Sequence, residues 1–421
     1  MILRVINHPY EFDMKNLCIT FFPHEKIRLE GEEDPVVVTT RRETDGSFFV
    51  SAKVYDVYRE TTAKPEPADE EHLVLSVTLY RLLSGILGFA PPWGVLYGVR
   101  PAKLMHRLCA QMGDDAAVAH FQTAFLAQKS KAELAHEVML HENRSIARSG
   151  PKSFSLYVSI PFCPTRCAYC SFVSHSIEKT HKLMTPYVDL LLRELEETSK
   201  YAKELGLELA TVYFGGGTPT TLSAQDLGRI FSTIEQNFDL SHLMEYTVEA
   251  GRPDTVTRER LEVIQAAGVQ RISINPQSFN DKVLEAIGRR HTAQQTLDAF
   301  ALARDCGFDH INMDFIAGLP EDDLPSFQRS IQTALDLQAE SITVHTLALK
   351  TSAYMVTREQ TFDLKDRLTV SNMVDYAGQT LHGAGYYPYY MYRQSKSLGN
   401  FRTVREITEQ YTPIAVRLFM L

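Results

Sequence analysis

The chain has 421 residues, of which 44% are hydrophobic and 23% charged, and its formal net charge is −9. This composition is typical of a soluble globular protein, and the acidic balance argues against a nucleic-acid-binding protein. No uncharged apolar run reaches about 18 residues and the N-terminus lacks a secretory pattern, so neither a membrane span nor a signal peptide is expected.

Residues 1–64 have the pattern of a β-rich segment. Short runs rich in Val, Ile, Phe and Tyr favour strands at ILRVI, LCITFF, KIRLE, PVVVTTR and FFVSAKVYDVY. The sequence KPEPADEE then interrupts the pattern, and apolar residues at helical spacing continue from residue 70 to about Arg148. The stretch ARSGPKS, residues 147–153, is typical of a hinge. We therefore expect an α+β N-terminal domain over residues 1–150.

From Ser155 onward, strand patterns alternate with helix patterns. Strands are predicted at SLYVSI, LATVYF, EYTVEA, RISINPQ, INMDFI and SITVHTLAL. Helices are predicted at residues 186–205, with Thr185 as N-cap, and at 224–237, 258–267, 324–337 and 365–382, with further helical runs between residues 281 and 306. Strict alternation favours a parallel sheet, which right-handed crossovers would curl into an incomplete (β/α)6 barrel over residues 151–390. Such folds bind ligands at the carboxyl ends of their strands.

Residues with special chemistry follow the ends of these predicted strands. In strand order they are the cysteines after the first strand, GGG at 215–217, Glu249, Gln277, Asp314 and Ala348. Because the carboxyl ends of parallel strands meet at one rim, we expect these residues to share one site.

Three of the six cysteines, Cys163, Cys167 and Cys170, lie within PFCPTRCAYC. We expect a cytoplasmic protein, in which thiols stay reduced and disulfides are rare. One alternative is zinc, with His175 completing a Cys₃His tetrahedron, although the other cysteines stand alone in the sequence. Another is an iron–sulfur cluster in which three thiolates leave one iron open. The third is that the cysteines are small core residues.

The motif CPTRCAYC, which is C-x₃-C-x₂-C, together with GGGTP resembles the radical S-adenosylmethionine (SAM) superfamily. In that superfamily SAM chelates the fourth iron of a [4Fe-4S] cluster, and an electron from the cluster cleaves SAM to a 5′-deoxyadenosyl radical. The segments LYVSIPFC, VYFGGGTPT and MDFIAGLP are similar to the oxygen-independent coproporphyrinogen oxidase family, with its HemN, HemW and HemZ branches. The resemblance covers roughly residues 155–390 and is greatest to the HemZ type.

The resemblance implies a role for each rim residue. Cys163, Cys167 and Cys170 would ligate the cluster, and the cluster-bound SAM would contact Tyr157, Gly216 and Glu249. A second SAM would contact Tyr169, Gly217, Thr218, Gln277, Arg289, Asp314 and Ala348. The residue types suit these roles, since glycine admits close backbone approach, a carboxylate can bind a ribose diol and arginine can bind a carboxylate bidentately. Each residue also has a purely structural alternative. The glycines could form a plain turn, Glu249 could be an ordinary strand-end carboxylate and Tyr157 a core tyrosine. Gln277, Arg289 and Asp314 could form a local ion-pair network.

The resemblance further implies conversion of coproporphyrinogen III to protoporphyrinogen IX without oxygen, with a low-potential donor such as flavodoxin or ferredoxin. Substrate carboxylates would meet Arg289, Arg290 or Arg393, and YYPYYMY would line the barrel mouth or form a buried strand edge.

Two departures from the family pattern leave other functions open. Phe172 stands where HemN-type oxidases carry a further cysteine and HemW-type haem chaperones carry an aromatic residue. A haem-binding trafficking protein is therefore one alternative, and another radical SAM reaction is the other. After Asn400 the resemblance stops, so for the atypical tail at residues 391–421 we expect a truncated chain or a shifted reading frame, with activity affected.

Overall fold

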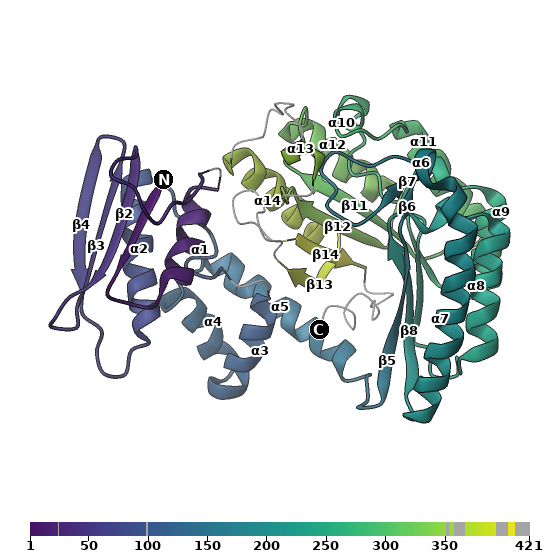
Figure 1. Ribbon diagram of the computed structural model, residues 1–421, viewed down its shortest axis with the longest axis horizontal. Coiled ribbons are helices and arrows are strands. Elements are labelled where there is room, and N and C mark those ends of the chain that lie inside the picture. The colour runs from purple at the N-terminus through teal and green to yellow at the C-terminus, as the bar shows by residue number, and fades with distance from the viewer. Residues whose placement is uncertain (24, 98–99, 351–352, 358–366, 393–402, 409–421) are drawn as a thin grey trace. The chain divides into compact units, whose positions relative to one another are not determined.

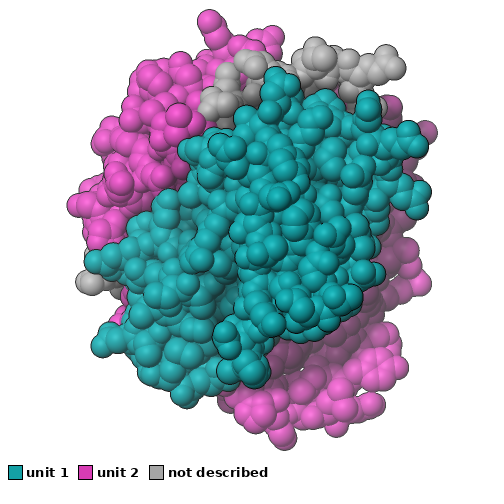
Figure 2. Space-filling model, turned by 90° about the vertical axis from the view of Figure 1, so that its left-hand side faces the viewer, with its two compact units in different colours: residues 1–139, 391–401 teal, residues 140–390, 402–421 magenta. Residues whose placement is uncertain are grey.

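The computed structural model describes residues 1–23, 25–97, 100–350, 353–357, 367–392 and 403–408. The chain divides into two compact units, residues 1–139 with 391–401 and residues 140–390 with 402–421 (Figure 2). Among the described residues, no helix is long and apolar enough to span a bilayer. Arg393 lies outside the described residues, so its expected contact with a substrate is not addressed by the structure.

The first unit contains a four-stranded sheet in the order β1-β2-β3-β4 (Figure 1). Its strands are β1 (Ile2–Ile6), β2 (Val36–Arg42), β3 (Phe48–Val54) and β4 (Val57–Ala63). β1 runs parallel to β2, and the other neighbours are antiparallel. Buried side chains of β2 and β3 share one hydrophobic core with helices α1 (Glu11–Phe21) and α2 (Glu71–Leu87).

Two of the strand predictions in this unit are wrong. The run LCITFF lies mostly in helix α1, because Met14, Leu17, Cys18 and Phe21 are buried at helical spacing and this packing overrides the β propensity of the run. KIRLE forms a single bridge, between Arg28 and Ile2. The run FFVSAKVYDVY splits into β3 and the start of β4 at a tight turn that begins with Tyr55, whose φ is 52°.

Among the described residues of 70–148, the helical prediction is confirmed as four helices. After α2 come α3 (Pro101–Met112), α4 (Asp114–Thr123) and α5 (Lys129–Ile146). Pro101 occupies the first turn of α3, where its missing N–H breaks no helical hydrogen bond. Gly113, with φ of 84°, ends α3 and donates its N–H to the Cys109 carbonyl at 2.9 Å. The chain therefore turns sharply between α3 and α4.

The second unit contains an eight-stranded sheet that curls into a half-barrel, which confirms the expected incomplete (β/α)6 architecture (Figure 1). Its order is β13-β14-β12-β11-β10-β9-β8-β5. The six predicted strands are parallel neighbours: β5 (Ser153–Ile160), β8 (Glu208–Gly216), β9 (Glu245–Glu249), β10 (Arg271–Ser273), β11 (Ile311–Ala317) and β12 (Ser341–Thr346).

Two further strands extend this sheet. β14 (Thr403–Ile407) pairs antiparallel with β12, with Ser341 opposite Ile407. The run YYPYYMY forms the largely buried strand β13 (Tyr387–Tyr392), so the strand reading of that run is correct. β10 is shorter than predicted, because the chain leaves the extended conformation before Gln277, whose φ is 69°.

Helices follow the parallel strands and cover the outside of the half-barrel, as α7, α8 and α9 show clearly (Figure 1). They are α7 (Met184–Glu204), α8 (Ala224–Asn237), α9 (Arg258–Ala266), α10 (Asp281–Ala286), α11 (Ala293–Asp305), α12 (Leu324–Asp336) and α14 (Arg367–Gly383). The shorter elements are β6 (Phe162–Cys163), β7 (His175–Ser176), α6 (Ile177–Thr180) and α13 (Tyr354–Thr357).

Side-chain caps explain where several of these helices begin. The N-cap residues whose side chains accept a backbone N–H are Ser223, Thr257, Asn280, Thr292 and Asp323. The predicted Thr185 cap is wrong, because α7 begins at Met184 and Thr185 lies within its first turn. A 3₁₀ turn at His181–Leu183 leads directly into α7, which removes the need for a side-chain cap there.

Candidate functional site

The carboxyl ends of β5 and β8 lie side by side, with Ile160 opposite Gly216 in the parallel register. Beyond them the two loops remain hydrogen-bonded. The N–H of Gly217 donates to the Ile160 carbonyl at 2.7 Å, and the N–H of Thr218 donates to the Phe162 carbonyl at 2.8 Å. The glycine run therefore lies against the cysteine loop, as the rim argument predicts.

The glycine run permits an approach that a side chain would block. A Cβ atom on Gly217 would lie 2.6 Å from the Phe162 carbonyl oxygen and 2.9 Å from the Cys163 sulfur. Gly216 has φ of 106°, a backbone conformation that L-residues rarely adopt. Both positions therefore require glycine for the cysteine loop to keep its path.

All three loop cysteines are free thiols, with Cys163 and Cys167 buried and Cys170 half-buried. Burial, followed by the neighbouring Cys167, raises the pKa of Cys170 to about 11. Burial also raises the pKa of Cys163, although the Thr218 hydroxyl, which donates to its sulfur at 3.6 Å, acts in the opposite direction. A buried set of thiols needs a positive partner to ionise, and iron supplies one.

A single zinc ion would require these thiols to lie close together. Thiolates around one tetrahedral zinc lie roughly 3.7 Å apart, given a Zn–S distance of about 2.3 Å. Among the described residues, three possible metal ligands with atoms all within 4.8 Å of one another occur in the first unit, at Cys109, Asp114 and His136. His175, the suggested fourth zinc ligand, is exposed on β7. Within the part of the chain that the structure describes, the three loop thiols do not form a ligand group this close.

Tyr213 contacts both Tyr157 and Glu249 and so connects them. The rings of Tyr157 on β5 and Tyr213 on β8 stack with centroids 5.8 Å apart, and the Tyr213 hydroxyl donates to Glu249 Oε1 at 2.5 Å. Burial raises the pKa of Glu249 to about 7, although the hydrogen bond from Tyr213 opposes this shift. The carboxyl end of β9 is thus joined to the two strands that lead into the loops.

Arg289 and Tyr169 also lie together. Arg289 is buried and donates from Nη1 to the Asn275 carbonyl at 2.6 Å and from Nη2 to the Tyr169 hydroxyl at 3.5 Å. Its Nε atom is buried without a hydrogen-bond partner among the described residues. A buried guanidinium donor of this kind fits a ligand carboxylate.

Gln277 and Asp314 are joined through their backbones, since the Gln277 N–H donates to the Asp314 carbonyl at 2.9 Å. Asp314 also lies 3.6 Å from His345 Nε2. Burial acts to raise the pKa of Asp314, but His345 and Arg405 outweigh it and hold the pKa below its usual range. Ala348 follows β12 at the same end of the sheet. These residues lie on or after β10, β11 and β12.

Three residues at this rim were not predicted from the sequence. Tyr213 and His345 lie in the second halves of β8 and β12. This position near the carboxyl end of a predicted strand is the sequence signal that could have identified them. Arg252, which follows β9, is 3% exposed and donates from Nη1 to the backbone oxygen and hydroxyl of Thr165 at 3.0 and 2.9 Å. Arg252 therefore holds the cysteine loop between Cys163 and Cys167.

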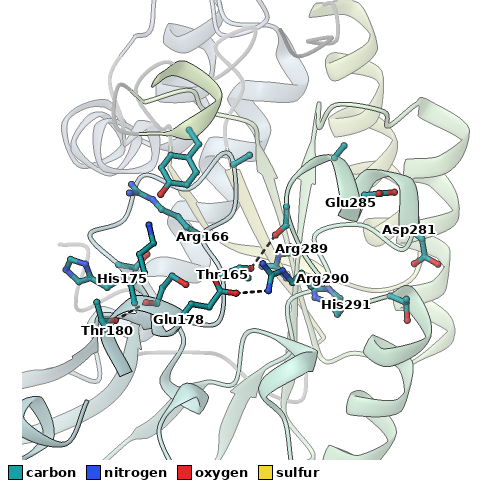
Figure 3. Close-up of a pocket in the computed structure, with 18 residues that line it drawn as sticks. Thr165, Arg166, His175, Glu178, Thr180, Asp281, Glu285, Arg289, Arg290 and His291 are labelled. Carbon is teal, nitrogen blue, oxygen red and sulfur yellow. Dashed lines mark hydrogen bonds and ion pairs between the residues drawn. The ribbon is translucent and has the colours of Figure 1, made fainter. Parts of the chain in front are cut away.

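A cavity of about 1020 Å³ lies beside the cysteine loop (Figure 3). Thr165 and Arg166 line it from the loop, and Arg289 and Arg290 line it from the segment after α10. Glu178 pairs with Arg290 at 2.7 Å across this cavity. The other predicted rim residues are not among its lining, so the cavity adjoins the rim without containing the whole predicted site.

Comparison with known proteins agrees with this geometry. Residues 157–334 match the family model of the radical SAM superfamily. The chain is 34% identical over 406 residues to the oxygen-independent coproporphyrinogen-III oxidase-like protein HemZ of Bacillus subtilis, which covers 93% of this chain and 81% of that protein. It is 38% identical over 197 residues to the heme chaperone HemW of the same organism, covering 47% and 51% of the two chains.

The solved structure of coproporphyrinogen III oxidase (HemN) from Escherichia coli, a radical SAM enzyme, matches with a TM-score of 0.52 and 24% identity. It covers 66% of this chain and 60% of that one, and it supports the fold. The half-barrel and its cysteine loop define a radical SAM protein. Within that superfamily the chain belongs to the HemN/HemW-like family that includes the coproporphyrinogen-III oxidase-like protein HemZ.

The cofactors of this family are a [4Fe-4S] cluster and SAM. The residues present fit them: three free thiols lie in one loop, the space beside Gly217 is closed to any side chain, and a buried donor of Arg289 lacks a partner among the described residues. We therefore assign the cysteine loop to the iron–sulfur cluster and not to zinc.

Proposed function

We propose that this chain is an oxidoreductase that decarboxylates coproporphyrinogen III to protoporphyrinogen IX without oxygen. The observation that carries the proposal is the 34% identity to the HemZ oxidase-like protein, which extends over 93% of this chain and so includes the first unit as well as the half-barrel. For each of two propionates, one SAM would take up a hydrogen atom from the β-carbon and be released as 5′-deoxyadenosine and methionine. Carbon dioxide would leave the carboxylate and one electron would pass to a one-electron acceptor, which leaves a vinyl group.

The cluster ligands in this proposal are Cys163, Cys167 and Cys170. When bound, the cluster and SAM supply one-electron chemistry, and the protein positions them and excludes water. Arg252 holds the cysteine loop through Thr165, and Gly216 and Gly217 let the backbone pass close to that loop. Cluster reduction requires a low-potential donor, for which flavodoxin or ferredoxin is suited. The proposed compartment is the cytoplasm.

Two sets of residues would provide the SAM contacts. Tyr157, Gly216 and Glu249 serve the SAM on the cluster, and the stacked Tyr213 orients the Glu249 carboxylate. The second SAM site consists of Tyr169, Gly217, Thr218, Gln277, Arg289, Asp314 and Ala348. Its strongest support is Arg289, whose buried guanidinium keeps one N–H directed at no described partner and can bind a carboxylate.

The activity test uses anaerobically reconstituted protein, a chemical reductant, SAM and coproporphyrinogen III. The proposal predicts release of carbon dioxide and 5′-deoxyadenosine together with formation of protoporphyrinogen IX. Arg289→Lys keeps the charge but loses the planar fork, so it lowers turnover per iron bound, with the iron content measured in the same sample because Arg289 also hydrogen-bonds to Cys167. Cleavage of SAM without decarboxylation of this substrate would instead assign the chain to another radical SAM reaction.

The second candidate is a haem chaperone of the HemW type. It is favoured by Phe172, which is 63% exposed just beyond the last cysteine and replaces the cysteine of HemN-type oxidases, and by the 38% identity to a HemW protein over half of the chain. Stoichiometric haem binding without carbon dioxide release would support this candidate against the oxidase.

A further inference from the structure

Three helices bring a thiol, a carboxylate and an imidazole together in the first unit. Cys109 lies near the end of α3, Asp114 begins α4 and His136 lies on α5. One ligand atom from each side chain lies within 4.8 Å of the other two. His136 Nε2 is 3.0 Å from Asp114 Oδ2, and the Cys109 thiol also hydrogen-bonds to Asp114.

Backbone geometry fixes two of these residues against each other. The Gly113 N–H donates to the Cys109 carbonyl at 2.9 Å, which ends α3, and Asp114 starts the next helix at once. The His136 side chain is 23% exposed and the Asp114 side chain 55% exposed, so an ion can enter from solvent. The group therefore offers three metal-ligand atoms on helices and a path by which an ion can enter from solvent.

The donor chemistry suits zinc. Thiolate, imidazole and carboxylate are its usual protein ligands, at about 2.0 to 2.3 Å, which places neighbouring ligand atoms roughly 3.3 to 3.7 Å apart. A thiolate and a carboxylate together neutralise a divalent cation, so binding leaves no net charge at the site. The hard cations Mg²⁺ and Ca²⁺ prefer oxygen ligands and do not match a thiol.

We propose that Cys109, Asp114 and His136 form a zinc site in the first unit, with the fourth position occupied by water. The ion replaces the shared protons of the hydrogen-bonded group and clamps α3, α4 and α5 together. This site is separate from the cysteine loop, whose three sulfurs lie in the second unit. The inference does not depend on the substrate of the half-barrel.

The alternative is a hydrogen-bonded group with no ion, in which Asp114 accepts from both neighbours. The two readings differ for His136→Gln. An amide can donate to Asp114 as the imidazole does, but it is a poor zinc ligand. A hydrogen-bonded group tolerates this change, whereas a zinc site loses its ion.

The test measures zinc binding to the full-length chain in which Cys163, Cys167 and Cys170 are replaced by alanine, so that the cluster loop cannot take the ion. We expect one zinc per chain by elemental analysis. In this background Cys109→Ser and His136→Gln should each weaken zinc binding by at least about 10- to 100-fold, since even the loss of an outer-shell partner costs that much. Competition with a chromogenic chelator measures the affinity.

Two matched controls separate ligand loss from general damage. Cys306→Ser removes a half-buried thiol that accepts a hydrogen bond from Arg258 and lies outside the proposed ligand group, and His106→Gln removes an exposed imidazole on α3. Both variants should bind zinc with unchanged affinity. Circular dichroism checks that every variant retains its helices.

A second readout uses cobalt in place of zinc. Thiolate-to-cobalt charge-transfer absorption is expected in the background chain and should disappear in Cys109→Ser. Failure of the background chain to bind zinc would overturn the proposal, and so would unchanged affinity in both Cys109→Ser and His136→Gln.

Discussion

The Tyr213 hydroxyl donates a hydrogen bond to Glu249 Oε1 at 2.5 Å, across the adjacent strands β8 and β9. Tyr213 also stacks on Tyr157 from β5, so one side chain links three consecutive strands of the half-barrel at their carboxyl ends. This link places a carboxylate with a raised pKa next to the loops that carry the glycine run and the cysteines.

Ionisation of Glu249 should oppose folding over a defined pH range. Its pKa in the folded state is about 7, above the ordinary value of about 4.3. The stability linked to this group is therefore fully present below pH about 4.3 and is lost as pH rises through about 7. Because one pKa unit corresponds to about 1.4 kcal/mol, the total loss should be on the order of 3 to 4 kcal/mol.

Urea denaturation of the cofactor-free chain at several pH values between about 5 and 8 measures this effect. Glu249→Gln should flatten the pH dependence, because the amide does not titrate. Tyr213→Phe removes the hydrogen bond that lowers the pKa and should extend the loss of stability to higher pH. An identical pH dependence in Glu249→Gln and the parent chain would contradict the assignment.

Replacing any one of the three loop cysteines should remove the cluster. Cys163→Ser, Cys167→Ser and Cys170→Ser each leave too few thiolates to hold it, so iron and sulfide should fall to background after anaerobic reconstitution. Cys306→Ser is the matched control, because Cys306 is also a free, half-buried thiol, and it should retain full iron content. Retention of the cluster in all three loop variants would disprove this ligand set.

A methyl group at Gly217 should damage the site. In Gly217→Ala the new Cβ would lie 2.6 Å from the Phe162 carbonyl oxygen, so the cysteine loop must move. We expect a loss of about 1 to 3 kcal/mol of stability from overpacking, together with reduced iron content.

Gly228→Ala provides the comparison for Gly217→Ala. Gly228 lies within α8, and the nearest atom outside its own helix turn that an added Cβ would meet is Val263 Cγ1, at 3.6 Å. This change should raise stability by about 0.5 to 1 kcal/mol, because alanine favours a helix interior. Equal thermal unfolding of the two variants would contradict the steric argument.

Arg271 tests the polar core of the half-barrel. It is 3% exposed, lies 3.7 Å from the fully buried Glu245, and donates to Ser341 Oγ at 3.1 Å. Arg271→Met leaves the Glu245 carboxylate without its buried cation and should cost about 3 to 5 kcal/mol in unfolding free energy.

The control for Arg271→Met is Arg290→Met. Arg290 lies closer to its partner, 2.7 Å from Glu178, but their side chains are 69% and 53% exposed. Because water screens exposed pairs, this change should cost less than about 1 kcal/mol. Denaturant unfolding measures both variants, and a larger loss at Arg290 would show that burial does not control the two interactions.

Much of the half-barrel could be predicted from the sequence because its signals are local. Alternating strand and helix patterns indicated six parallel strands, and the cysteine motif lies within eight residues, so its ligands needed no tertiary information to be recognised. The prediction failed where packing overrode propensity. The run LCITFF has β-type residues, yet Leu17, Cys18 and Phe21 face one core at helical spacing in α1.

The sequence by itself therefore determined the family, the succession of six strand–helix units along the chain and the cysteine loop, because each depends on residues that are close together in the chain or on a simple periodic pattern. Only the tertiary structure decided which distant residues support that loop. Arg252 reaches Thr165 across 87 positions, and His136 meets Asp114 across 22. Such pairings depend on how loops and helices pack, and a single sequence carries no periodic signal for contacts between residues so far apart.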